Sequence, residues 1–124
     1  MNVFLASLLR KALQPNVSAD VPGHLRLQFP TYRLLPDAAL PYLHYFDDAM
    51  CLLPGVLHAE LNPTIGTALI RYDPSVTSRR QILGWMDVLI EEGIRCADDK
   101  TLVLLSEKDM VPKLRERLLA RLNA

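Results

Sequence analysis

Apolar residues recur at two different spacings along the chain, and these spacings predict which segments are helices and which are strands. In residues 2–13 they recur every three or four positions, as on one face of an amphipathic helix. Residues 15–22 contain two prolines, an asparagine and a serine, a composition that is typical of a linker. From Gly23 the period changes to two, which predicts a half-buried strand whose covered side carries Leu25, Leu27 and Phe29.

The middle of the chain continues with both periods. A helix is expected from Asp37, which can cap it, to about Leu53, where a Pro-Gly pair follows. Residues 56–61 and 67–73 predict two strands joined by a turn rich in Asn, Pro and Gly. Alternation along the first of these strands places Leu57 on its covered side, together with Ala59 and Leu61.

The last third of the chain returns to helical spacing. A helix over residues 79–92 should stop at Gly93, because glycine often supplies the left-handed residue after a helix. Residues 94–97 then predict a short strand, which a turn can extend into residues 101–105. Residues 109–123 predict a final amphipathic helix with basic residues on its polar face.

The predicted elements therefore follow the order β-α-β-β-α-β, with one additional helix at each end of the chain. This order defines an α+β, ferredoxin-like βαββαβ sandwich, whose usual strand order is 4-1-3-2. We accordingly divide the chain into an N-terminal helix and linker (1–22), a central ferredoxin-fold domain (23–97) and a C-terminal helical extension (98–124).

Composition narrows the function classes. Half of the residues are hydrophobic, which excludes a disordered chain, and the 14 Lys and Arg balance the 14 Asp and Glu. A formal net charge of zero argues against a nucleic-acid binder that works mainly by neutralising phosphates. The order of apolar and basic residues at the N-terminus does not match a signal peptide, so a cytoplasmic location is expected.

Five short segments carry a resemblance to a known family. They are Gly23-His-Leu-Arg-Leu-Gln-Phe-Pro30, Leu53-Pro-Gly-Val56, Leu61-Asn-Pro-Thr-Ile-Gly66, Ile70-Arg-Tyr-Asp-Pro74 and Glu92-Gly-Ile94. In this order they resemble the heavy-metal-associated (HMA-like) domain family, and more closely its divergent bacterial branch. That branch occurs as modules on metal-transporting P-type ATPases and as small separate proteins.

The resemblance implies the ferredoxin-like fold and a setting in metal homeostasis or metal transport. It does not imply the family's metal site, which is a Cys-x-x-Cys pair between the first strand and the first helix. Residues 30–37 hold no cysteine, although paired thiolates are what select Cu(I) or Zn(II). Of this vestigial metal loop, Tyr32 and Arg33 remain as candidate interaction residues, with Cys96 expected at the same end of the domain.

The remaining metal-ligating residues are few. Cys51 and Cys96 are expected at opposite ends of the domain, so neither a disulfide nor a shared metal site is predicted between them. His24 and His58 should lie on the outer face of the sheet with one strand between them, which makes them weak candidates for Cu or Zn. His44, Asp47 and Asp48 share a helix face, but a solvated polar face explains them as well.

We find no nucleophile motif, phosphate loop or HExxH sequence, so no enzyme activity is expected. Three hypotheses remain. The first is a non-catalytic accessory module that binds a protein partner, such as a metal-transporting ATPase or a membrane transporter. The second is a metal carrier that uses Cys96, or His24 with His58. The third is a membrane-peripheral adaptor held by residues 2–13.

Two further features concern partners. The apolar rows of the terminal helices must be buried somewhere, and a homodimer through these helices is one way to bury them. RNA is not expected as a partner, because alternation turns Phe29 and Tyr72 inward and leaves the outer face without aromatic residues.

Overall fold

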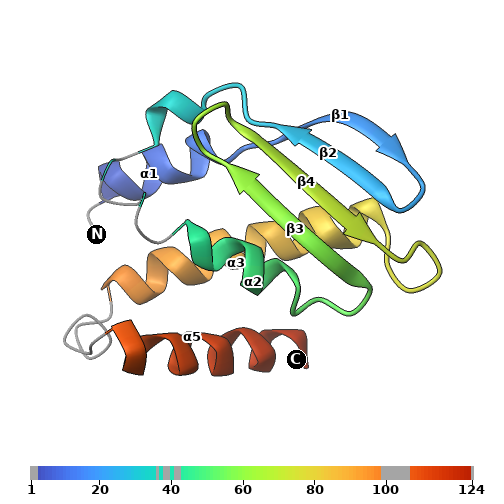
Figure 1. Ribbon diagram of the computed structural model, residues 1–124. Coiled ribbons are helices and arrows are strands. Elements are labelled where there is room, and N and C mark those ends of the chain that lie inside the picture. The colour runs from blue at the N-terminus through green and yellow to red at the C-terminus, as the bar shows by residue number, and fades with distance from the viewer. Residues whose placement is uncertain (1–2, 36, 38–39, 41–42, 99–106, 124) are drawn as a thin grey trace.

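The computed structural model describes residues 3–35, 37, 40, 43–98 and 107–123, and it is an α+β structure with one four-stranded antiparallel sheet (Figure 1). This confirms the predicted α+β class. The elements are α1 (Val3–Ala12), β1 (Asn16–Val21), β2 (His24–Gln28), the 3-10 helix η1 (Tyr32–Leu34), α2 (His44–Met50), β3 (Val56–Asn62), β4 (Thr67–Tyr72), α3 (Arg79–Asp98) and α5 (Glu107–Leu122).

The strands lie in the order β1-β2-β4-β3, and every neighbouring pair is antiparallel. The three predicted strands near residues 23–29, 56–61 and 67–73 are β2, β3 and β4, and their spatial order agrees with the predicted 1-3-2 arrangement. Gly23 and Gly66, both with positive φ, lie in the turns of the two hairpins β1–β2 and β3–β4.

The prediction that residues 15–22 form a linker was wrong, because Asn16–Val21 form β1. All six residues of this strand are exposed. Polar and apolar residues do alternate along it, with Val17, Ala19 and Val21 as the apolar ones, but the flanking Pro15 and Pro22 favoured a linker. Its position depends on backbone pairing with β2, which runs from Asn16 opposite Gln28 to Val21 opposite His24. β1 is an edge strand of the sheet, and prolines are tolerated at such edges, so Pro15 and Pro22 do not exclude a strand between them.

The predicted strand at residues 94–97 was also wrong, because α3 continues to Asp98 and includes these residues. Gly93 is not among the glycines with positive φ, so it does not end the helix. Ile94 is 5% exposed and reaches the core from the last turns of α3. The proposed extension at 101–105 lies outside the described residues. The fourth strand of the sheet is therefore β1, which precedes β2 in the chain.

Two other boundaries differ from expectation. The helix expected over residues 37–53 is the shorter α2, and turns occupy Cys51–Gly55, where Gly55 has a φ of 95°. In β3 the register shifts between Val56 and His58, a β-bulge that turns Val56 inward and leaves Leu57 64% exposed. The predicted inward position of Leu57 was wrong, whereas Ala59 is buried as predicted.

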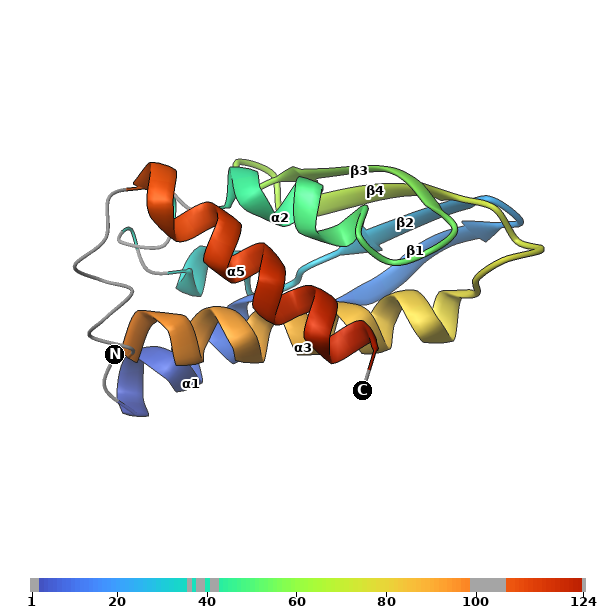
Figure 2. The same cartoon turned by 90° about the horizontal axis from the view of Figure 1, so that it is seen from below.

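The helices cover one side of the sheet. Figures 1 and 2 show α3 behind the sheet, α2 packs beside the edge strand β3, and α1 lies beyond one end of the strands, next to η1. The core between the layers takes residues from the whole chain, from Ala6, Leu9 and Leu13 near α1 to Leu118 of α5. The terminal helices are thus buried in part within the same chain, through Ala6 and Leu9 of α1 and Leu118 of α5, whereas Val3 and Phe4 stay exposed. The opposite side of the sheet carries no described helix.

Candidate functional site

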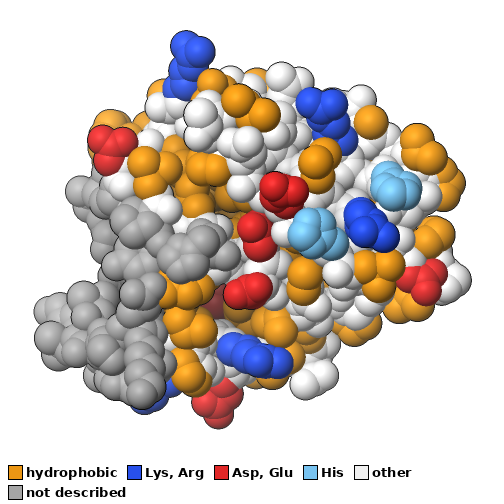
Figure 3. Space-filling model, viewed as in Figure 1, with side chains coloured by type: hydrophobic (Ala, Val, Ile, Leu, Met, Phe, Trp, Pro, Cys, Tyr) orange, Lys and Arg blue, Asp and Glu red, His pale blue; other side chains and the backbone are white. Residues whose placement is uncertain are grey.

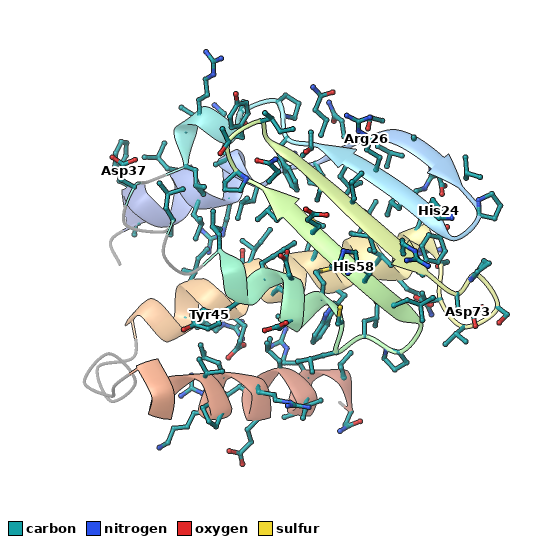
Figure 4. All side chains as sticks on the ribbon, viewed as in Figure 1. His24, Arg26, Asp37, Tyr45, His58 and Asp73 are labelled. Carbon is teal, nitrogen blue, oxygen red and sulfur yellow. The ribbon has the colours of Figure 1, made fainter. Side chains whose placement is uncertain are left out.

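The uncovered side of the sheet, which we call the outer face, is the candidate site. Alternation along β2 turns Leu25 and Leu27 into the core and leaves His24, Arg26 and Gln28 exposed. On β4 the same alternation leaves Leu69 and Arg71 exposed. Figure 4 shows His24, Arg26 and His58 on this face, as their predicted outward orientation requires.

The strand register brings the outward residues into rows that cross the sheet. Arg71 of β4 is paired with His24 on one side and with His58 on the other. In the next row Leu69 lies between Arg26 and Glu60. Directly opposed residues have Cβ atoms about 5 Å apart and diagonal neighbours about 7 Å, so these side chains form one continuous surface.

The first of these rows bears on the predicted weak metal site at His24 and His58. The two histidines are separated by β4, as predicted, and Arg71 stands between them. Figure 3 shows an arginine or lysine side chain between the two pale blue histidines on this face. A metal cation bridging the imidazoles would lie beside a guanidinium that is always protonated, and like charges at such distances repel.

The three residues His24, Arg26 and Arg71 form a patch that we call the basic patch. The guanidinium groups of Arg26 and Arg71 make no hydrogen bond or ion pair with any side chain of the described residues. By contrast Arg10 is bound to Glu91 and Arg79 to Asp20, at 2.6 and 3.3 Å. The basic patch therefore presents two free cationic forks on an open surface.

The surface charge changes from positive over β2 and β4 to negative beside β3 and α2. Asp47 of α2 lies close enough to Glu60 of β3 and to its neighbour Asp48 for both charges to act on it, and we call these three residues the acidic edge. His58 bridges the two regions, since its Nε2 lies 3.9 Å from Glu60 Oε2. Figure 3 shows the acidic side chains gathered on one side of a histidine and a cationic side chain on the other.

Asp47 has a structural role at this edge. Its Oδ1 accepts a hydrogen bond of 2.9 Å from the backbone N–H of Leu61, which faces α2 on the edge strand β3. Burial raises the pKa of the Asp47 carboxyl, the Leu61 hydrogen bond lowers it, and Glu60 and Asp48 raise it further. The predicted trio of His44, Asp47 and Asp48 is thus divided, since Asp47 is engaged with β3; the His44 side chain lies outside the described residues.

The loop that carries Tyr32 and Arg33 packs against the β3–β4 hairpin. A Cβ atom at Gly66 would overlap the ring of Tyr32, which shows how closely this ring covers the turn. Arg33 Nε donates to the Tyr32 hydroxyl at 3.4 Å, and its guanidinium lies 5.7 Å from the centre of the ring. The Tyr32 hydroxyl raises the pKa of Arg33, mainly through this hydrogen bond. Tyr32 is therefore partly structural, whereas Arg33 is exposed.

The two cysteines do not form a described site. Cys51 follows α2, is exposed and is a free thiol, and its pKa is raised mainly by partial burial. Cys96 lies in α3 and not in a strand as predicted, and its side chain is outside the described residues. Among the described residues, no three His, Cys, Asp or Glu side chains are grouped so that they could hold a metal ion.

The helix surfaces offer one other exposed apolar feature. Val3 and Phe4, at the start of α1, are 85% and 70% exposed, whereas Ala6 and Leu9 of the same helix are in the core. No helix in the described parts of the chain has the length and apolar character that crossing a bilayer requires.

Comparison of the chain with family models, with curated proteins and with solved structures finds no match. The resemblance of five segments to the heavy-metal-associated domain family therefore stays a prediction from the sequence. The outer face, with its basic patch and acidic edge, is the part of the molecule on which a functional proposal has to be built.

Proposed function

We propose that this protein is a non-catalytic interaction module that binds a protein partner through the outer face of its sheet. The observation that carries the proposal is the asymmetry of the two sides of the sheet. The helices bury one side, while the other is uncovered and displays Arg26 and Arg71 without internal partners. Exposed guanidinium groups without internal partners are suited to recognition, because a partner breaks no existing ion pair and the sheet fixes where the two side chains begin.

We also infer that the fold is a variant of the ferredoxin-like arrangement. The elements β2, α2, β3, β4 and α3 follow the order expected for the first five elements of that fold, and β2-β4-β3 have its spatial order. The edge beside β2, which the last strand normally takes, is taken by β1 from the N-terminal side. An accessory role in metal homeostasis, next to a metal-transporting ATPase or transporter, rests on the family resemblance alone.

Site-specific photo-crosslinking tests the proposed interface. A photoreactive residue replaces Leu69, which is 47% exposed at the centre of the outer face, and a matched one replaces Leu119, which is 38% exposed on α5. We expect a discrete crosslinked protein adduct from position 69 in the cells that make this protein, and none of the same size from position 119. Equal adducts at both positions, or none at position 69, would contradict the proposal.

Metal titration separates this proposal from the metal-carrier hypothesis. The reduced protein is titrated with Cu(I), Zn(II) and Fe(II) by calorimetry, and its mass is followed by light scattering. One ion bound per chain or per dimer with sub-micromolar affinity, lost in Cys96→Ser or His24→Ala, would favour the carrier. The position of Arg71 between His24 and His58 is the reason we expect no such site at the two histidines.

Val3 and Phe4 give the membrane-peripheral hypothesis one supporting observation, because both are exposed at the free end of α1. Removing residues 2–13 would also remove Ala6 and Leu9 from the core, so deletion is a poor test. The double variant Val3→Ser/Phe4→Ser keeps the core intact. If the helix docks on membranes, co-sedimentation with liposomes should fall in this variant and persist in the unaltered chain.

A further inference from the structure

We propose that the basic patch binds an extended acidic segment of the partner, with Arg26 and Arg71 each paired to a carboxylate two positions apart in that segment. This inference rests on the proposed function, since it names the partner chemistry for the same outer face. The argument has three parts, which concern the free charges, their spacing and the absence of aromatic residues.

The first part is charge complementarity. Arg26 and Arg71 are exposed and bind no described side chain, and His24 lies beside Arg71 and adds a third polar group. Arginine presents a planar fork that matches a carboxylate through two parallel hydrogen bonds. The whole chain has no net charge, so the patch is a local concentration of positive charge and not part of a generally basic surface.

The second part is spacing. Arg26 is paired with Leu69, so Arg71 is its diagonal neighbour on β4. Diagonal Cβ atoms in an antiparallel pair are separated by about 7 Å. Side chains two positions apart in an extended peptide point the same way and are also about 7 Å apart. A segment with acidic residues at alternate positions therefore places one carboxylate over each arginine, while Leu69 and His24 occupy the other two corners of the same four-residue patch.

The third part decides between classes of anionic partner. Phosphates of a single-stranded nucleic acid have a similar spacing, but such strands are usually held by stacking of their bases on aromatic side chains. Phe29 and Tyr72 are buried at 1% and 7% exposure, and the outward residues of β2 and β4 include no aromatic. The acidic edge also limits the site, because Glu60, Asp47 and Asp48 repel an anionic segment and confine it to β2 and β4.

The test is a titration of the intact, isotope-labelled chain followed by amide NMR shifts. The probe is an eight-residue peptide that alternates Glu and Thr, and its matched control has Gln in place of Glu. We expect shifts confined to β2 and β4 with the Glu peptide, weakened by salt, and none with the Gln peptide. An oligothymidine of eight nucleotides is the second probe, and tighter binding of it to the same strands would overturn the acidic-peptide assignment.

Two double variants with equal charge changes locate the binding. Arg26→Gln/Arg71→Gln should weaken the peptide affinity about tenfold, as expected from losing two exposed ion pairs. Arg115→Gln/Arg121→Gln on α5 removes the same charge from exposed positions and should leave the affinity unchanged. Equal weakening in both variants would mean that only net charge matters, and it would overturn the inference.

The two proposals can fail separately. If the peptide does not bind but position 69 still forms a discrete crosslinked adduct, the outer face is an interface for a partner of different chemistry, and only the acidic-segment inference is wrong. If the peptide does not bind and no adduct forms at position 69, both proposals are wrong.

Discussion

The two faces of the sheet are made from the same strands, yet they meet different requirements. Leu25, Leu27 and Ile70 are no more than 2% exposed, whereas the residues next to them in the chain, such as Arg26 and Arg71, lie in solvent. The covered face must fill the space against α2 and α3 without voids, so its side chains are constrained by packing. The outer face is not packed against a described helix, so its side chains can vary without disturbing the core.

The largest difference between the faces should appear when one large side chain is removed from each. Leu27→Ala opens a cavity at a position with no exposure, and we expect a loss of about 3 kcal/mol in the free energy of unfolding. Arg26→Ala, the neighbouring residue on the outer face, should change it by less than about 0.5 kcal/mol. Urea denaturation of both variants measures the contrast, and similar losses would mean that the outer face is also packed against something.

The rim where the Tyr32 loop closes over the β3–β4 turn should be the next most sensitive place. Gly66→Ala adds a Cβ that overlaps the Tyr32 ring at a residue with a φ of 69°, where side chains are strained. We expect a cost of about 2 kcal/mol in unfolding free energy. Combining this change with Tyr32→Ala should recover the part due to overlap, since the ring is gone. A double variant no better than Gly66→Ala would assign the whole cost to the backbone.

Substitution of Asp47, beside the edge strand β3, should lower the free energy of unfolding by less than the Leu27 and Gly66 variants do. Asp47→Ala leaves the Leu61 N–H without its acceptor and should cost about 1 kcal/mol, whereas Asp47→Asn keeps an oxygen there and should cost less. Thermal melting of both variants at neutral pH measures this difference. Equal losses in the two variants would mean that the charge of Asp47 matters and not its hydrogen bond.

The same residue predicts a pH dependence. Because burial raises the pKa of Asp47 in the folded protein, the folded state holds this proton more tightly than the unfolded state. Stability from the protonated form is present below the ordinary carboxyl pKa of about 4 and is lost as the pH rises through the raised value. As the pH rises through this range, the free energy of unfolding of the unaltered protein should therefore fall relative to that of Asp47→Asn, as measured by denaturant unfolding at each pH. A relative rise would contradict the direction of the shift.

The smallest predicted change in the free energy of unfolding is an increase, and it comes from a substitution in α3, away from both faces of the sheet. Gly93 has ordinary helical geometry inside α3, and a Cβ at this position would meet no neighbouring atom. Gly93→Ala should therefore raise the free energy of unfolding by about 0.5–1 kcal/mol, because alanine loses less backbone entropy in a helix. A destabilised variant would indicate instead that α3 ends at Gly93, as the sequence pattern suggested.

The sequence predicted which residues of the strands face the core, but not which residues become neighbours on the outer face. Period-two alternation correctly placed Leu25, Leu27, Phe29 and Tyr72 inside and His24 outside, because the side-chain direction in a strand is a local property. The alternation failed at Leu57, since the bulge in β3 adds one residue and reverses the direction from there to the strand start. The same alternation turns Arg26 and Arg71 outward, but only the strand register makes them diagonal neighbours.

The sequence by itself therefore determined the α+β class, the three strands β2, β3 and β4, the main helices and the inward residues, since each depends on local periodicity. Tertiary structure alone decided which segment completes the sheet. Backbone pairing with β2 selected the exposed Asn16–Val21, while Ile94 is buried more effectively as part of α3. Pairing between strands uses backbone groups common to nearly all residues, so the alternation in Asn16–Val21 does not say which strand it joins. The juxtaposition of the two arginines follows from the same kind of pairing.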